Sequence, residues 1–188
     1  MLHTVAMALL PEHLDGGDIE LCRARPELSD AIFDATIASF SELHQWMTWA
    51  NEVPTRAALT EFLNSAQELF DCDEDCNYAL IEKLSGEVVG SSGLHFKGDP
   101  GAREIGYWVR SDRTGRGYAT SAARALSNAA FRFLPIDRVI IRMDKANIAS
   151  ASVPAKIGFR LLCEEERPLE TPGHTGTGLI WVRDRDSA

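Results

Sequence analysis

The sequence predicts an α/β (α+β) protein with one mixed, mostly antiparallel central sheet of about seven strands and helices on both faces. Its 188 residues, 45% of them hydrophobic and 25% charged, match the composition of a single soluble globular domain. Early predicted strands follow one another through short turns, which favours antiparallel pairing. A later pair of strands encloses a helix, and that arrangement requires a parallel crossover.

The first half of the chain carries the signals for two helices and a hairpin. Residues 19–25 alternate as a strand does, and residues 28–47 carry apolar side chains at helical spacing. Thr55 follows Pro54 and can cap a second helix over 56–70. A hairpin is expected over 77–97.

The second half alternates strands with helices. A strand over 103–110 leads through a glycine-containing loop into a helix from about 117 to 133, which Pro135 ends. The remaining elements are predicted as strand, helix, strand and strand over 137–144, 147–158, 159–167 and 178–184. The order predicts one domain over 1–188, with its core at about 18–183.

The net charge of -9 argues against nucleic acid as a partner, because nucleic-acid binding needs a basic surface. No apolar run reaches the roughly 18 residues of a membrane span. The segment 1–18 lacks a basic region ahead of its apolar patch, so no signal peptide is predicted and a cytoplasmic location is expected.

The cysteines predict no metal site. Cys72 and Cys76 in "CDEDC" have no second pair at zinc spacing, and Cys22 and Cys163 are scattered. We therefore expect reduced cysteines and no metal.

The stretch "SDRTGRG" (111–117) predicts an anion site ahead of the following helix. Gly115 and Gly117 leave backbone N–H groups exposed, and Arg113 or Arg116 can add charge-assisted hydrogen bonds. The loop lacks the lysine of a Walker A motif. A dinucleotide fingerprint remains an alternative, with Thr120 at its third glycine position and Asp144 as the ribose-binding acid. It is disfavoured because two helices and a hairpin precede the loop.

Three segments together resemble the GNAT acyltransferases, in particular their RimJ/RimL branch. "TGRGYAT" (114–120) is similar to the acetyl-coenzyme A motif Q/R-x-x-G-x-G/A. "NIASASVPAKIGF" (147–159) is similar to the N-x-x-S-x-x-x-x-x-K-x-G-F segment of that branch, and "HQWMTWA" (44–50) to its aromatic segment. The order of predicted elements fits the family's fold over roughly 18–183.

The resemblance implies an acyl-CoA co-substrate, most often acetyl-CoA. It places the pyrophosphate on the loop and on the start of the helix, at residues Arg113, Thr114, Gly115, Arg116, Gly117, Tyr118, Ala119 and Thr120. It pairs the pantetheine arm with the backbone of Trp108, Val109 and Arg110, and with Asn147 from the other side. Two departures stand out: Thr114 replaces the usual Gln or Arg, and Pro154 falls inside the last predicted helix.

Transfer of an acyl group to an amine needs a proton acceptor for the amine and a proton donor for the leaving thiolate. Glu104 is the candidate base, with an ion pair to Arg103 or a neighbouring arginine as the alternative. Ser150 is the candidate acid, with Tyr107 and Tyr118 as alternatives. Candidates for acceptor binding are Trp46, Trp49 and His95.

The sequence thus predicts an acyl-CoA-dependent N-acyltransferase that acts by direct attack within a ternary complex. The acceptor is expected to be a peptide or small-molecule primary amine, attracted by the acidic runs 71–75 and 164–166. A homodimer is possible. A coenzyme A-binding regulatory domain without turnover and a dinucleotide-binding oxidoreductase are the alternatives.

Overall fold

The computed structural model describes residues 10–185, so the start of the segment read for a signal peptide lies outside the described part. One sheet has the strand order β1-β2-β3-β4-β5-β6-β8-β7. Only β5 and β6 run parallel; the other neighbours are antiparallel. The strands are β1 (His13–Asp15), β2 (Ile19–Arg23), β3 (Asp75–Glu82), β4 (Val88–His95), β5 (Ala102–Val109), β6 (Arg138–Asp144), β7 (Arg160–Glu166) and β8 (Thr177–Asp184).

The predicted fold class is confirmed, with eight strands in place of about seven. The additional strand is β1, which precedes the predicted core and pairs with β2 in the register His13↔Cys22. The two strands are joined through Gly17, whose φ of 78° lies in the left-handed region that glycine adopts without strain.

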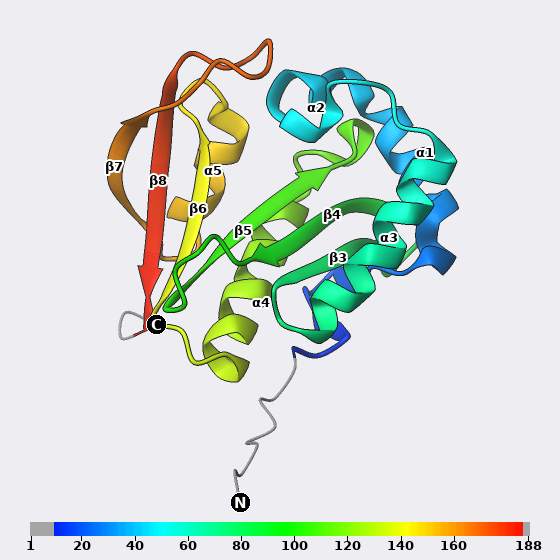
Figure 1. The fold of residues 1–188 in the computed structure, drawn as a ribbon, viewed down its shortest axis with the longest axis horizontal. Coiled ribbons are helices and arrows are strands. Elements are labelled where there is room, and N and C mark those ends of the chain that lie inside the picture. The colour runs from blue at the N-terminus through cyan, green and yellow to red at the C-terminus, as the bar shows by residue number, and fades with distance from the viewer. Residues whose placement is uncertain (1–9, 186–188) are drawn as a thin grey trace, which may run out of the picture.

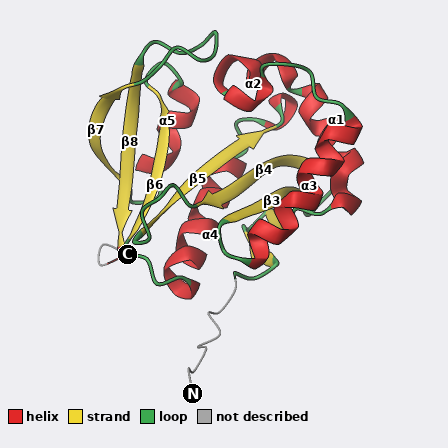
Figure 2. Ribbon diagram, in the orientation of Figure 1, coloured by secondary structure: helices red, strands yellow, loops and turns green. Residues whose placement is uncertain are grey.

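Helices cover both faces of the sheet (Figure 2). They are α1 (Ser29–Ala38), α2 (Phe40–Trp46), α3 (Arg56–Asp71), α4 (Tyr118–Phe133) and α5 (Ile148–Ala155), with short 3-10 turns at Pro26–Leu28, Thr48–Ala50 and Ser111–Arg113. The main core packs α4 against one sheet face, with Leu126 and four buried alanines bringing the helix close to the strands. A second core packs Ile32 of α1 and Leu63 of α3 on the other face.

The helix predicted over 28–47 is two helices, and this prediction was wrong at Ser39. Ser39 has φ −120° and ψ 7°, outside the helical range, and separates α1 from α2. Its buried hydroxyl oxygen accepts a hydrogen bond from the backbone N–H of Ser111 at 3.1 Å. The break therefore anchors the glycine loop, a contact between residues 72 positions apart.

The parallel strands β5 and β6 separate along most of their length. They pair only between residues 102–104 and 138–140, and then diverge toward their carboxyl ends, as Figure 1 shows. The glycine loop with α4 follows β5, and α5 follows β6, so both helices begin at the open end of this split. The fold thereby places two helix N-termini and a widening gap between strands side by side.

Candidate active site

A cleft of about 650 Å³ crosses the sheet at the split between β5 and β6. Its lining brings together nine of the residues singled out from the sequence: Trp46, Trp49, His95, Glu104, Tyr107, Trp108, Asp144, Asn147 and Ser150. The residues of the glycine loop do not line this cleft and lie beyond its open end. The described residues thus form two adjoining regions, a cleft and a loop.

The floor of the cleft is a row of polar side chains on three neighbouring strands. Asp75 of β3 lies opposite His95 of β4, and His95 lies opposite Glu104 of β5. His95 Nδ1 lies 2.9 Å from Asp75 Oδ1, and both side chains are partly buried. Sequence reasoning missed Asp75, because it read the acidic run 71–75 as surface charge. The hairpin register was the only signal that could have paired it with His95.

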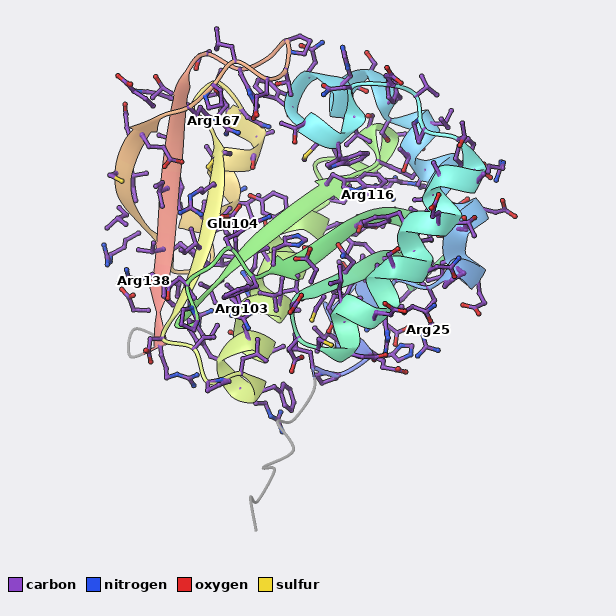
Figure 3. All side chains as sticks on the ribbon, viewed as in Figure 1. Arg25, Arg103, Glu104, Arg116, Arg138 and Arg167 are labelled. Carbon is purple, nitrogen blue, oxygen red and sulfur yellow. The ribbon has the colours of Figure 1, made fainter. Side chains whose placement is uncertain are left out.

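Glu104 is paired with an arginine from the adjacent strand, which was the alternative predicted for it. One of its carboxylate oxygens, Oε2, accepts a short hydrogen bond from Arg142 of β6. Arg142 also approaches Glu165 of β7, at 3.6 Å. Arg103 does not take part, because its guanidinium lies over the ring of Phe96. Figure 3 shows Glu104 at the centre of the molecule, on β5.

Tyr107 and Ser150 meet on the other face of β5. The Tyr107 hydroxyl lies 3.0 Å from the Ser150 carbonyl oxygen and 3.1 Å from Ser150 Oγ. Pro154, four residues beyond Ser150, has no N–H to donate to that carbonyl, so the tyrosine takes the place of the missing helical bond. The predicted helix therefore forms with Pro154 in its last turn, and Ser150 keeps its place in the cleft.

The start of α5 is fixed by Asn147. Its side-chain oxygen caps the helix by accepting from the Ser150 N–H at 3.0 Å. Ser152 does not cap the helix, because its hydroxyl donates to the Ala149 carbonyl. Asn147 lines the cleft, and its side-chain NH₂ group is a hydrogen-bond donor available to a ligand.

The two tyrosines proposed as proton donors lie in different surroundings. Burial raises the pKa of Tyr107 to about 12, and its hydrogen bond with Ser150 offsets only part of this effect. Tyr107 is therefore a neutral hydroxyl at physiological pH. Tyr118 is buried and donates a short hydrogen bond to Glu82. That contact turns its side chain away from the cleft, so Tyr118 as a sulfur-side donor was wrong.

The glycine loop has the geometry of an anion site. Gly115 and Gly117 have φ values of 77° and 83°, and a Cβ built at either one would have no neighbour within 4 Å. Gly117 is the N-cap of α4, where no side-chain cap hydrogen bond is made. The first N–H groups of the helix, toward Ala119 and Thr120, consequently have no intrahelical acceptor. Open space, free N–H groups and the helix dipole coincide here.

The arginines around the loop are already paired with carboxylates. Arg113 makes a short contact with Glu87, and Arg116 lies 3.1 Å from Glu82. Hydrogen bonds from Tyr118 and then Ser85 lower the pKa of Glu82, which keeps this partner ionised. Figure 3 shows Arg116 in the upper right part of the molecule and Arg138 at the lower left. A bound anion would share these arginines with acids.

The backbone N–H and C=O groups of β5 that face the split between β5 and β6 belong to other residues than those predicted. The Arg110 N–H donates to Val89 of β4 at 2.8 Å, and its carbonyl accepts from Arg113, so Arg110 has no free backbone group. The Gly106 carbonyl accepts from Ser92 of β4 at 2.7 Å and faces the same way. Because successive strand residues point their N–H and C=O groups to opposite sides, Tyr107 and Val109 face the split. Trp108 faces β4 instead, and the predicted pairing through Trp108 and Arg110 is corrected.

Thr114 and Trp49 also differ in setting. The Thr114 hydroxyl donates to the Ser111 carbonyl at 3.0 Å, so its side chain closes the loop on itself. Trp49 is half exposed, and its ring lies 6.4 Å from the ring of Trp108.

The loop between β7 and β8 contacts α2. Trp46 packs beneath Gly173 of this loop. The Gly173 N–H and the Thr171 hydroxyl both donate hydrogen bonds to the Gln45 carbonyl. This contact closes the cleft on the side of the aromatic segment.

Asp144 is occupied by structural hydrogen bonds. Its carboxylate accepts from the Ala146 N–H and from both the N–H and the hydroxyl of Thr175, at 2.8–2.9 Å. Burial alone would raise the pKa of Asp144, but these hydrogen bonds outweigh it and lower the pKa. Asp144 therefore fixes the junction of β6 and α5 and offers no free oxygen for a ribose.

The acidic runs are also largely paired. Asp71 lies 2.8 Å from Arg23, and Glu164 lies 2.6 Å from Lys145. Asp73 is buried. Within residues 10–185, one group of three potential metal ligands has its donor atoms within 4.8 Å of one another: His13, Glu20 and Cys22, at the sheet edge away from the cleft. Cys72 and Cys76 are not part of it.

The chain matches the family model described as an acetyltransferase (GNAT) domain over residues 19–160. The Bacillus subtilis (strain 168) protein YdaF, provisionally named a ribosomal N-acetyltransferase, is 37% identical over an alignment of 141 residues, and the match covers 71% of this chain and 73% of that protein. A structure of RimL, the ribosomal L7/L12 alpha-N-protein acetyltransferase, with coenzyme A has a TM-score of 0.86 at 20% identity and covers 94% of this chain and 100% of its own. Mycobacterium smegmatis RimJ with a CoA disulfide has a TM-score of 0.79 at 23% identity, over 92% and 85%.

The chain belongs to the GNAT acetyltransferase family. It is an acyl-CoA-dependent N-acetyltransferase, as the resemblance implied, and the dinucleotide-binding alternative is overturned. The split and the glycine loop fit the two parts of acyl-CoA, an extended arm and a pyrophosphate. Among the described helices, none combines the length and the apolar character that crossing a bilayer requires.

Proposed function

We propose that this enzyme transfers the acetyl group of acetyl-CoA to a primary amine, either the α-amine at a protein or peptide N-terminus or the amine of a small molecule. The reaction proceeds by direct attack within a ternary complex. The observation that carries the proposal is the split between β5 and β6, with the glycine loop at its open end and a cleft across its floor. We propose further that the whole chain acts as one domain in the cytoplasm, without a metal and without nucleic acid, alone or as a homodimer.

Binding of acetyl-CoA, which supplies an activated thioester, is assigned to both sides of the split. The N–H groups at Gly115, Gly117 and the first turn of α4 hold the pyrophosphate, and Arg113 and Arg116 lie beside it. The backbone of Tyr107 and Val109 pairs with the pantetheine arm as an added strand would. The Asn147 amide lies on the opposite side of the gap.

Protonation of the leaving thiolate is assigned to the Tyr107–Ser150 pair. The tyrosine hydroxyl can donate to the Ser150 carbonyl or to Ser150 Oγ, and the serine hydroxyl is then free to donate to sulfur. The high pKa of Tyr107 keeps its proton in place until the thiolate develops. The pair lies on the α4 and α5 face of β5, opposite the polar floor.

An α-amine is the easier of the common protein nucleophiles. With a pKa of about 7.7–8.0, roughly a tenth to a sixth of it is neutral at pH 7, against about 0.04% of a lysine amine with a pKa near 10.4. Trp46 and Trp49 line the cleft beside the polar floor and are assigned to the acceptor's first side chain or flat ring. YdaF and RimL are named for ribosomal or N-terminal protein acetylation, which supports the same class.

A mass-spectrometric screen of acetyl-CoA and succinyl-CoA against peptides, polyamines and aminoglycosides tests the proposal. The expected product is a peptide or small molecule heavier by one acetyl group on nitrogen. Transfer only to hydroxyl groups, with every amine untouched, would contradict it, and so would tight binding of acetyl-CoA with no turnover on the whole panel.

A further inference from the structure

We propose that His95, held by Asp75, accepts the proton that the acceptor's ammonium must lose, and that Glu104 binds this ammonium without deprotonating it. The inference rests on the proposed amine transfer and assigns a residue to its proton-accepting step. Three features of the floor support it: the contact between His95 and Asp75, the place of the free imidazole nitrogen, and the pairing of Glu104 with Arg142.

The first feature fixes the tautomer of His95. Its Nδ1 lies 2.9 Å from Asp75 Oδ1, and an ionised carboxylate can only accept a hydrogen bond. Nδ1 therefore carries the hydrogen, and the lone pair remains on Nε2. The two residues face each other in the β3–β4 register, so strand pairing holds the contact.

The second feature is the position of Nε2 above two glycines. A Cβ built at Gly93 would lie 2.9 Å from Nε2, and one at Gly106 would lie 3.3 Å from it. Gly93 and Gly106 face each other across β4 and β5, so the imidazole ring lies over bare backbone. A Cβ at Gly106 would meet only imidazole atoms within 4 Å. The ring covers Gly106, and any side chain there would displace it.

Gly106 also marks the start of the split. The last paired residue of β5 is Glu104, opposite Ile140, so Gly106 lies two positions into the unpaired part. A thioester held along the gap would bring its carbonyl carbon beside this point. The free Nε2 thus lies on the acceptor's side of the reacting bond, while Tyr107 and Ser150 lie on the far face.

The third feature is that Glu104 already has a cationic partner. Its Oε2 is bound to Arg142, while its other oxygen can accept from an ammonium. Glu104 and His95 are opposite one another, so an ammonium bound by Glu104 would lie next to the imidazole. The charged groups that face the cleft around His95 are Asp75, Lys97, Glu104 and Arg142, with Asp144 and Arg167 toward the open end.

The proton balance closes through exchange with solvent. His95 Nε2 takes one proton from the bound ammonium and passes it to solvent. The neutral nitrogen forms a bond to the thioester carbon, and the carbon–sulfur bond breaks. As the amide forms, the nitrogen loses a second proton to His95 Nε2, which again releases it to solvent. The sulfur gains a proton from the Tyr107–Ser150 pair, and the pair regains one from solvent. The net reaction releases one proton and requires no oxidant, reductant or further reactant.

The kinetic test compares four variants of the full chain over pH 5.5 to 9, with acetyl-CoA and an unblocked trialanine peptide. His95→Gln is expected to lower kcat about a hundredfold and to abolish the acidic limb of the profile. Asp75→Asn, a change of a positioning residue, should lower kcat about tenfold, because the imidazole is no longer held with its hydrogen on Nδ1. Glu104→Gln should raise the KM for the peptide about tenfold and leave the limb in place.

The matched control is His13→Gln. His13 forms a second histidine–carboxylate pair, with Glu20 at 3.0 Å, on the β1–β2 edge away from the cleft. Its substitution should leave every kinetic constant within twofold of the wild type. The affinity for coenzyme A and the thermal midpoint of each variant establish that the protein is folded.

A second measurement needs no turnover. In the resting enzyme labelled with ¹⁵N-histidine, the His95 signals, identified by their absence from His95→Gln, should show hydrogen on Nδ1, and Asp75→Asn should redistribute it. Hydrogen on Nε2 would overturn the inference, as would an acidic limb removed by Glu104→Gln and kept by His95→Gln. If no amine on the panel is acetylated, the proposed function fails, while the tautomer still decides whether the pair is built as inferred.

Discussion

The glycine loop and the polar floor of the cleft, to which we assign the coenzyme and the acceptor respectively, are built in opposite ways. The loop offers backbone N–H groups at Gly115, at Gly117 and in the first turn of α4, all close together in the sequence. The floor offers side chains from β3, β4 and β5, which span residues 75 to 104, and Arg142 of β6 pairs with Glu104 among them. A site made of backbone tolerates changes in side chains except where a Cβ would block it, whereas a site made of side chains depends on each one.

The largest expected effect lies on the side-chain half of this comparison. Tyr107→Phe should lower kcat about a hundredfold, because it removes the hydroxyl that lies between the Ser150 carbonyl and Ser150 Oγ. Since the pKa of Tyr107 is about 12, wild-type kcat should not fall through ionisation of this residue below about pH 10. Steady-state kinetics from pH 6 to 10 check both statements.

The matched variant is Tyr78→Phe. Tyr78 is also a buried tyrosine whose hydroxyl donates to a backbone carbonyl, that of Pro11 at 2.8 Å, but it lies in the core below α4. It should alter stability and not kcat. Wild-type turnover in Tyr107→Phe would show that Ser150 donates the proton without the tyrosine.

The second prediction concerns the glycine loop, the region built of backbone groups. Gly117→Val should raise the Kd of coenzyme A at least tenfold, about 1.4 kcal/mol, because a β-branched side chain would occupy the open space in front of the N-terminus of α4. Isothermal titration with coenzyme A measures it. The affinity for coenzyme A should fall, while kcat for the bound substrates should change little.

Backbone strain is the competing explanation, since Gly117 has a φ of 83°. Gly17→Val serves as the control, because Gly17 has a φ of 78°, is equally open, and lies in the β1–β2 turn. It should lose a similar amount of stability and keep its affinity. Equal affinities in the two variants, both folded, would show that the anion binds elsewhere.

The same contrast explains what the sequence could predict. The open glycine loop ahead of a helix was predictable because glycines, arginines and a helix start follow one another in a few residues. The pair Asp75–His95 was not predictable, and for Glu104 a neighbouring arginine was expected but Arg142 could not be named. Each pair depends on strand register and strand order, which no local pattern fixes. The eighth strand and the break at Ser39 were missed for a related reason, since a three-residue strand and a single non-helical serine carry almost no periodic signal.

The third prediction concerns the contact between the β7–β8 loop and α2, which closes the cleft beside the polar floor. A Cβ at Gly173 would lie 2.5 Å from the Gln45 carbonyl oxygen and 2.8 Å from the Trp46 ring. Gly173→Ala should therefore push the β7–β8 loop from α2 and raise the acceptor's KM roughly fivefold, about 1 kcal/mol. The Kd of coenzyme A should stay within twofold, because the glycine loop is not touched. A changed Kd with an unchanged KM would show that this contact serves the cofactor side.

The smallest effect is expected at Asp144, which belongs neither to the glycine loop nor to the polar floor. Its carboxylate holds the junction of β6 and α5. Because its pKa is lowered in the folded protein, below the ordinary value of 3.8, the ionised group stabilises the fold at pH above about 5, and this contribution is lost as pH falls through the folded pKa. Asp144→Asn should lower the free energy of unfolding by about 1 kcal/mol at pH 7, because an amide keeps one acceptor for Thr175 or Ala146 but not both. Urea unfolding at pH 7 and pH 3.5 measures the difference between variant and wild type, which should shrink at the lower pH. A difference that grows on acidification would mean that Asp144 is protonated in the folded enzyme, and the hydrogen bonds assigned to its carboxylate would have to be reversed.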